Sequence, residues 1–257
     1  MDFQPHYGVL EAETIHFLSG APVTGPVERT GAGCALKDVV RFLPPVDPPN
    51  IIALGLNYLE HAKESRMELP PAPVIFLKAT TSLIGHLQPI RLPREAPDEV
   101  DYEAELAVVI GRTARNVTEE QAGAHVFGYT CGNDVSARDC QFRQDKQWAR
   151  GKSFDTFAPI GPWIETELDP ARLCIRSLLN GRVMQDAGTG DLIFKVPRII
   201  SYLSRQMTLP PGTVIMTGTP PGVGFARKEP VFLRPGDTIE VDIEGIGVLR
   251  NPVVAEP

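Results

Sequence analysis

Residues 98–111 read DEVDYEAELAVVIG, in which an acidic segment runs directly into an apolar one. The apolar half, residues 106–110, has no polar side chain, and this is typical of a strand that is buried on both faces. Asp101, Glu103 and Glu105 enter that strand at a spacing of two, so in an extended chain their carboxylates lie on one face. Like charges repel strongly beside a core of low dielectric constant. The acidic face therefore requires either solvent or a counter-charge.

Composition limits the possible partners of the chain. It has 257 residues, of which 42% are hydrophobic and 22% are charged, as is usual for a globular protein. The net charge of −7 argues against nucleic acid and anionic membranes as partners. No segment approaches the about 18–20 apolar residues of a membrane span, and the N-terminus lacks the pattern of a signal peptide. The four cysteines show no CxxC pairing, so we expect reduced thiols and a cytoplasmic location.

The 25 prolines and 23 glycines divide the chain into many short elements, which favours a mainly β (α+β) fold. Four prolines in residues 43–50 indicate a junction between a small N-terminal domain, residues 1–48, and a main domain, residues 49–257. We expect helices after Tyr58, over residues 136–147 with Ser136 as N-cap, and over 191–205. Strands are expected at residues 6–10, 14–18, 51–54, 74–78, 106–110, 127–131, 159–166, 173–178, 213–217, 238–243 and 248–254.

Three carboxylates form a candidate metal site. Asp134 follows the apolar strand predicted at residues 127–131, and it would join Glu103 and Glu105 if the two strands are neighbours. Carboxylate oxygens are hard ligands that suit Mg²⁺, Mn²⁺ or Ca²⁺, and three of them leave positions open for water and a substrate. The alternative is a solvated edge strand, which the apolar continuation of residues 106–110 makes less favourable.

His61 and Glu64 form a candidate base. They are three residues apart, so on a helix they share a face and can hydrogen-bond to each other. A neighbouring carboxylate fixes the tautomer of a histidine and makes it more basic, as a general base requires. The same spacing is also typical of an ordinary surface helix.

Four further polar residues stand near these motifs. Arg138 and Gln141 share a face of the helix predicted after Ser136, where Arg138 would support the acidic cluster and Gln141 would face a ligand. Lys152, in a predicted loop, is suited to an anionic group or a developing oxyanion. The hydroxyl of Thr219, in a Gly- and Pro-rich turn, is suited to a carboxylate. Taken alone, a solvated surface position is the more probable interpretation of Lys152, and Arg138 and Gln141 are common on the surface of helices.

Six segments in this order resemble the fumarylacetoacetate hydrolase family. They are GLNYLEHAKE, DYEAELAVVIG, GYTCGNDVSARDCQ, KSFDTFAPIGPWI, NGRVMQD and MTGTPPGVG, and they span residues 51 to about 250. The resemblance implies a rolled, mixed β-sandwich with a small N-terminal domain, usually paired as a homodimer. It also implies Mg²⁺ or Mn²⁺ held by Glu103, Glu105 and Asp134, with Asp101 beside the site.

The resemblance further implies a lid that carries His61 and Glu64 and activates a water, contacts from Gln141 and Lys152 to the reacting carbonyl, and a substrate carboxylate held at Thr219. Substrates of the family are 2-oxo acids with a second carbonyl, or their enols. We therefore predict a metal-dependent hydrolase that cleaves a C–C bond of an acylpyruvate-type 2,4-dioxo acid such as fumarylpyruvate. The alternatives are a 2-hydroxyhepta-2,4-diene-1,7-dioate isomerase, an oxaloacetate-type decarboxylase, and a non-catalytic binding protein. Arg66, Arg143 and Arg150 are candidates to meet a distal carboxylate.

Overall fold

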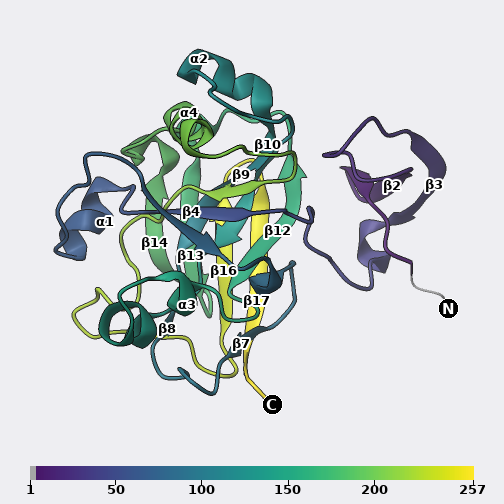
Figure 1. Ribbon diagram of the computed structural model, residues 1–257. Coiled ribbons are helices and arrows are strands. Elements are labelled where there is room, and N and C mark those ends of the chain that lie inside the picture. The colour runs from purple at the N-terminus through teal and green to yellow at the C-terminus, as the bar shows by residue number, and fades with distance from the viewer. Residues whose placement is uncertain (1–3) are drawn as a thin grey trace.

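Two curved sheets form the main body of the chain in the computed structural model, which describes residues 4–257 (Figure 1). The seven-stranded sheet has the order β5-β4-β15-β9-β10-β12-β6, and the five-stranded sheet has the order β14-β13-β16-β17-β7. A two-stranded sheet pairs β11 with β8. The pairs β15–β4, β12–β6 and β17–β7 are parallel and the other pairs are antiparallel, so the body is a mixed sandwich, as predicted. The strands of the body are β4 (Ile51–Gly55), β5 (Val74–Lys78), β6 (Leu83–Ile84), β7 (Ile90–Leu92), β8 (Val100–Asp101), β9 (Ala104–Ile110), β10 (Val126–Asn133), β11 (Ser136–Ala137), β12 (Ala158–Glu165), β13 (Cys174–Leu179), β14 (Arg182–Gly188), β15 (Val214–Met216), β16 (Thr238–Ile243) and β17 (Gly247–Ala255).

Strand β9 lies inside the larger sheet, between β10 and β15. All seven of its residues are buried, which confirms the prediction from the apolar run. Leu106 and Val108 pack into the core between the sheets, whereas Ala107 and Val109 pack into a second cluster on the other face. The solvated-edge interpretation of the acidic stretch is therefore wrong. Full burial of a side chain such as Leu106 stabilises the fold by about 1.5–3 kcal/mol.

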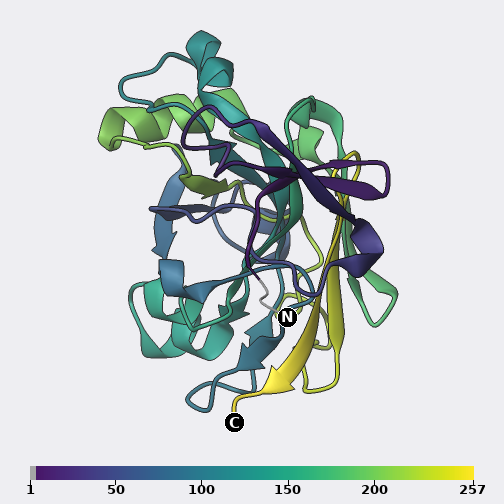
Figure 2. The same ribbon diagram turned by 90° about the vertical axis from the view of Figure 1, so that its right-hand side faces the viewer.

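The core between the sheets also receives helix α4 (Val196–Gln206). Its Ile199, Ile200 and Leu203 pack with Ile175 of β13 and Val241 of β16. In Figure 2 this helix and α2 (Glu119–Ala122) lie together at the end of the body farthest from the C-terminus. The predicted helix started too early, because residues 189–191 form a separate 3₁₀ turn and α4 begins only at Val196, with Pro197 in its first turn.

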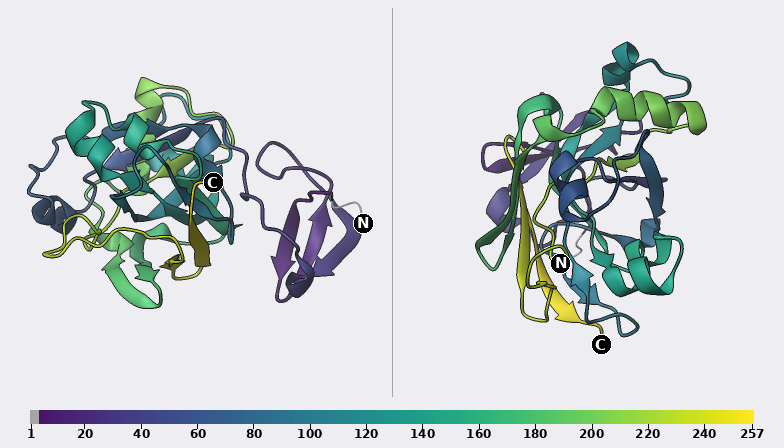
Figure 3. Two further views of the ribbon diagram at one scale, coloured as in Figure 1. Left: turned by 90° about the horizontal axis from the view of Figure 1, so that it is seen from below. Right: turned by 90° about the vertical axis from the view of Figure 1, so that its left-hand side faces the viewer.

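The N-terminal residues form their own three-stranded sheet, β1 (Gly8–Glu11), β2 (Thr14–Leu18) and β3 (Arg29–Ala35), which stands beside the body (Figures 1 and 3). Strand β3 was not predicted, since its sequence RTGAGCA lacks β-branched and aromatic residues after Thr30. Gly33 allows the close pairing, because a Cβ there would lie 2.3 Å from the carbonyl oxygen of Ile15.

The predicted helix over residues 136–147 is wrong. Ser136 and Ala137 form β11, in which Ser136 pairs with Asp101 of β8. A π-helical turn, Cys140–Gln144, follows, and α3 (Ala149–Lys152) comes after it. Ser136 is not a helix cap, because its hydroxyl donates to the carbonyl oxygen of Asp134 at 2.8 Å. The remaining helical elements are α1 (Leu59–Glu64) and the 3₁₀ turns Leu36–Asp38, Thr80–Ser82, Gly123–His125 and Pro170–Arg172. No helix among residues 4–257 has the length and apolar character that crossing a membrane requires.

Candidate active site

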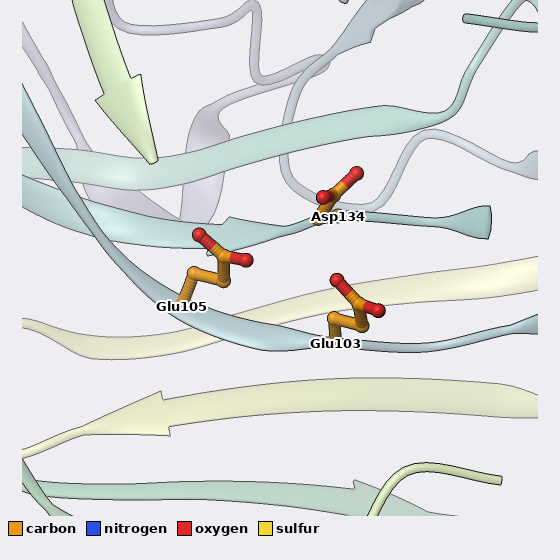
Figure 4. Close-up of side chains that lie close together, drawn as sticks. All are labelled: Glu103, Glu105 and Asp134. Atoms are coloured by element: carbon orange, nitrogen blue, oxygen red, sulfur yellow. The ribbon is translucent and has the colours of Figure 1, made fainter. Parts of the chain in front are cut away.

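Strand pairing brings the three predicted metal ligands together. Glu105 of β9 pairs with Gly132 of β10, and the backbone N–H of Asp134 donates to the carbonyl oxygen of Glu103 at 2.9 Å. One oxygen from each carboxylate lies within 4.8 Å of the other two. Figure 4 shows the three side chains close together, with Glu103 and Glu105 on one stretch of the chain and Asp134 on the neighbouring one. The spacing of two in the sequence thus places Glu103 and Glu105 on one face, as expected.

The donor set fits a divalent cation. The Oε2 atom of Glu105 accepts from the N–H of Gly218 at 2.7 Å, whereas its Oε1 is buried and has no hydrogen-bond partner within residues 4–257. Burial, and then the charges of Asp134 and Glu103, raise the pKa of Glu105 well above its usual value. An unpartnered buried oxygen among three carboxylates is the environment that a hard cation such as Mg²⁺ or Mn²⁺ would stabilise.

Two buried lysines balance part of this negative charge. Lys152 Nζ lies 2.8 Å from Glu103 Oε2 and 2.7 Å from Asp134 Oδ2, and Lys78 donates to the other oxygen of Asp134. Burial opposes ionisation of Glu103, but Lys152 and Arg138 hold the pKa of Glu103 below its usual value. Lys152 lies in α3 and not in the predicted loop. Lys78 was missed, although a lysine that ends the apolar strand VIFLK was a usable signal.

Arg138 is held by three partners. Its Nε donates to Asp101 at 2.9 Å and its Nη1 to Gln141 Oε1 at 2.8 Å, while its Nη2 lies 2.7 Å from Glu103. Asp101 also accepts from the N–H groups of Gly224 and Phe225. Asp101 therefore fixes Arg138 and a neighbouring loop, and its oxygens are not aimed at the cluster of three carboxylates. With Asp101 included, the cluster contains four carboxylates and three cationic side chains, Lys78, Lys152 and Arg138.

The predicted hydrogen bond between His61 and Glu64, the candidate general base and its partner, forms on α1. His61 Nδ1 lies 2.8 Å from Glu64 Oε1, and the His61 side chain is 8% exposed. The carboxylate of Glu64 also accepts from the N–H of Gly222, at 3.1 and 2.9 Å. Gly222 has a φ of +105°, and a Cβ there would lie 2.2 Å from the carbonyl oxygen of Met184, so only glycine fits. The turn thus fixes Glu64, and Glu64 orients His61.

Thr219 lies at the site, but its hydroxyl is already engaged. It donates to the carbonyl oxygen of Ala104 at 3.0 Å and accepts from Gln185 Nε2 at 2.7 Å. A substrate carboxylate at this turn would therefore need the backbone N–H of Thr219 as its donor. Sequence reasoning missed Gln185, although the residue lies in the segment NGRVMQD; its amide also holds the N–H of Ala104 through Oε1 at 3.0 Å.

One pocket unites most of these groups. Its floor consists of buried polar side chains, and its rim consists of partly exposed apolar ones. The floor is formed by His61, Glu103, Arg138, Gln141, Lys152 and Thr219. The rim is formed by Leu56, Met67, Phe142, Trp148 and Phe225.

The three arginines expected to meet a distal substrate carboxylate do not line the pocket. Arg143 forms a two-bond ion pair with Glu99, at 2.9 and 2.8 Å, and Arg150 is held by Asp145 at 2.6 and 3.0 Å. Both side chains are about half exposed, and neither lines the pocket, nor does Arg66. Arg143 and Glu99 are 44 residues apart, so the sequence did not reveal this pair, whereas Arg150 and Asp145 are only 5 residues apart.

Comparison with known proteins gives the same assignment for the main body. The family model described as fumarylacetoacetate hydrolase C-terminal matches residues 50–254, and a model described as Rv2993c-like, N-terminal matches residues 1–45. The mitochondrial oxaloacetate tautomerase fahd2 of Xenopus laevis is 47% identical over 85% of this chain and 69% of that protein.

Two solved structures are similar over nearly the whole chain. A 2-hydroxyhepta-2,4-diene-1,7-dioate isomerase from Mycobacterium marinum is 45% identical, with a TM-score of 0.84, over 95% of this chain and 88% of the other. A fumarylacetoacetate hydrolase from Exiguobacterium antarcticum is 41% identical, with a TM-score of 0.87, over 97% and 95%. The matched residues 50–254 include every side chain of the pocket floor. This chain belongs to the fumarylacetoacetate hydrolase family.

Proposed function

We propose that this protein is a divalent-metal-dependent enzyme that moves a proton between carbon and oxygen of a small 2-oxo acid, with oxaloacetate as the first candidate. The observation that supports this most is that His61, which Glu64 orients, lines one pocket with Glu103, and that Glu105, in the same cluster as Glu103 and Asp134, keeps an unpartnered buried oxygen. A base beside a cation site is what keto–enol conversion requires.

Glu103, Glu105 and Asp134 would hold the cation, which we propose is Mg²⁺ or Mn²⁺. When bound, such an ion polarises the substrate oxygens that it chelates and stabilises the negative charge that develops on them. A bound dication would add positive charge to a cluster in which four carboxylates outnumber three cationic side chains, and it would therefore make the site better suited to an anionic acid. No zinc-type cluster of Cys or His accompanies the three carboxylates among residues 4–257.

His61 would carry the proton. Because Glu64 holds Nδ1, the Nε2 atom is free to exchange a proton with the substrate. In the enol-to-keto direction, the enol O–H loses its proton and C3 gains one, while no C–C bond breaks and no water is consumed. Gln141 accepts from Arg138 through Oε1, so its NH₂ group is the end that can donate to a substrate oxygen.

Relatives favour proton transfer over the C–C hydrolysis predicted from the sequence. Xenopus laevis fahd2 is named an oxaloacetate tautomerase, and the Mycobacterium marinum protein is named an isomerase, which is also a proton-transfer reaction. The Exiguobacterium antarcticum protein is named a hydrolase and is 41% identical, so hydrolysis remains the competing activity. Pairing as a homodimer and a cytoplasmic location stay predictions.

The test measures the decay of the enol of oxaloacetate by ultraviolet absorbance, with Mg²⁺ or Mn²⁺ present, against the uncatalysed rate. We expect acceleration that a chelator abolishes, together with enzyme-dependent deuterium incorporation at C3 in D₂O. An acylpyruvate, fumarylpyruvate and 2-hydroxyhepta-2,4-diene-1,7-dioate are run in parallel, and pyruvate release from oxaloacetate is followed to detect decarboxylation.

The outcomes separate the candidate activities. Cleavage of an acylpyruvate without any effect on oxaloacetate would replace the proposal with hydrolysis. Loss of carbon dioxide as the main reaction would replace it with decarboxylation. If the protein binds metal and oxalate but converts none of the four compounds, the non-catalytic alternative stands.

A further inference from the structure

The pocket separates charge from apolar surface along its depth. The six polar residues of the floor are each at most 6% exposed as whole residues, whereas Phe142 on the rim is 39% exposed. Among the residues lining the pocket within 4–257, Arg138 and Lys152 are the permanent cations, and both belong to the floor. A negatively charged substrate group thus finds a cationic lining residue only at the bottom of the pocket.

The rim offers aromatic faces in place of charge. On the rim, the rings of Phe142 and Phe225 have centroids 5.1 Å apart, and Trp148 is in edge contact with the buried Phe76 below it, with centroids 5.6 Å apart. The guanidinium of Arg138 lies 4.4 Å from the centre of the Phe225 ring, so the aromatic wall begins directly above the floor. A carboxylate at this height would lose water without gaining a cation.

The position of Trp148 relative to the floor residue Lys152 is set by the backbone of α3. The N–H of Lys152 donates to the carbonyl oxygen of Trp148 at 3.1 Å, so the indole stands one helical turn from the floor lysine. Its ring also fills the space beside Gly55, where a Cβ would lie 2.5 Å from the indole. Trp148 therefore limits how far a charged chain can extend.

We propose that Trp148 and the apolar rim restrict this site to acids whose charged groups all reach the floor, and that a longer chain is accepted only with an uncharged far end. The inference rests on the proposed 2-oxo acid head group. A four-carbon diacid such as oxaloacetate satisfies it, with its second carboxylate near Arg138 and Gln141. A seven-carbon diacid would place its far carboxylate at the rim, where none of the lining residues within 4–257 is a cation.

Two acids of equal length test this directly. 2-Oxohexanoate and 2-oxoadipate share six carbons and the same head group, but one ends in a methyl group and the other in a carboxylate. Titration calorimetry with saturating Mg²⁺ should show 2-oxohexanoate binding about tenfold more tightly. Equal binding, or tighter binding of 2-oxoadipate, would overturn the proposal without any variant being made.

A rim cation should reverse the preference. Trp148→Arg places a guanidinium at the rim, so we expect 2-oxoadipate to become the tighter ligand. Leu77→Arg is the matched control, because Leu77 is 52% exposed on β5 and lies outside the pocket. An unchanged ratio in Trp148→Arg, or an equal change in Leu77→Arg, would contradict the role of Trp148. Binding is measured without turnover, so a failed tautomerase assay leaves this test intact.

Discussion

Glu105→Gln should stabilise the metal-free protein and weaken metal binding, because Glu105 is both a proposed ligand and a source of buried repulsion. The neighbouring carboxylate oxygens lie within 4.8 Å of each other. At that distance and an effective dielectric constant of about 20, each like-charge pair costs about 3.5 kcal/mol. Lys152 and Lys78 offset part of this, since each contacts a neighbouring carboxylate, so we expect a net gain of about 1–3 kcal/mol on removal of the charge.

The gain should appear as a rise in melting temperature of about 2–10 °C for a chain of this size. Saturating Mn²⁺ should then stabilise the unaltered protein by about 2.7 kcal/mol at a hundred times its Kd, and the variant by much less. Thermal unfolding with and without Mn²⁺ measures both effects. Glu99→Gln is the matched control, because Glu99 pairs with Arg143 on the surface and should change stability by at most about 1 kcal/mol.

The pH dependence has a defined sign. The raised pKa of Glu105 means that the folded, metal-free protein holds this proton more tightly than the unfolded chain. Its stability should therefore fall as pH rises above the ordinary carboxyl range, and Glu105→Gln should flatten that fall. A Glu105→Gln variant that is less stable without metal, or that keeps the full Mn²⁺ shift, would show that Glu105 is neither a source of repulsion nor a ligand.

Three further predictions follow from the same contacts. His61→Ala should lower turnover about 10²–10⁴-fold while Mn²⁺ affinity stays unchanged, and equal turnover would remove His61 from the mechanism. Asp101→Asn should cost about 3–5 kcal/mol of stability, because it leaves buried Arg138 underpaired, but it should alter Mn²⁺ affinity less than Glu103→Ala does; the reverse ranking would make Asp101 a ligand. Residues 60–71 should exchange amide hydrogens rapidly until oxalate and Mg²⁺ are added, because Leu69, one of their large apolar side chains, is 53% exposed; slow exchange in both states would make His61 a fixed part of the site.

The local sequence pattern was sufficient to predict those parts of the structure that depend on one dominant physical effect. The apolar run of residues 106–110 predicted a strand buried on both faces, and β9 confirms it. The spacing of Glu103 and Glu105, with Asp134 after a second apolar strand, predicted a cluster that strand register then produced. These inferences needed only the alternation of a strand and the repulsion of like charges.

The sequence did not reveal which residues pair or hydrogen-bond with residues far away along the chain. Ser136 has the chemistry of a helix cap, but pairing with Asp101 takes it into a strand. Lys78 and Gln185 lie 56 and 34 residues from the groups that they hold, Asp134 and Thr219, so only the folded sheets show their role. Local propensity is a weak guide wherever such tertiary pairing competes with it.

Glu103, Glu105 and Asp134 are proposed to hold one divalent cation beside His61. Anomalous diffraction from crystals grown with Mn²⁺ tests this assignment, because it locates the ion by its own scattering. We predict a single strong peak between the three carboxylates, about 2.0–2.2 Å from one oxygen of each, which Glu105→Gln reduces and Glu99→Gln does not. No peak at this position in a Mn²⁺-saturated crystal, or a peak bound only by other residues, would contradict the account.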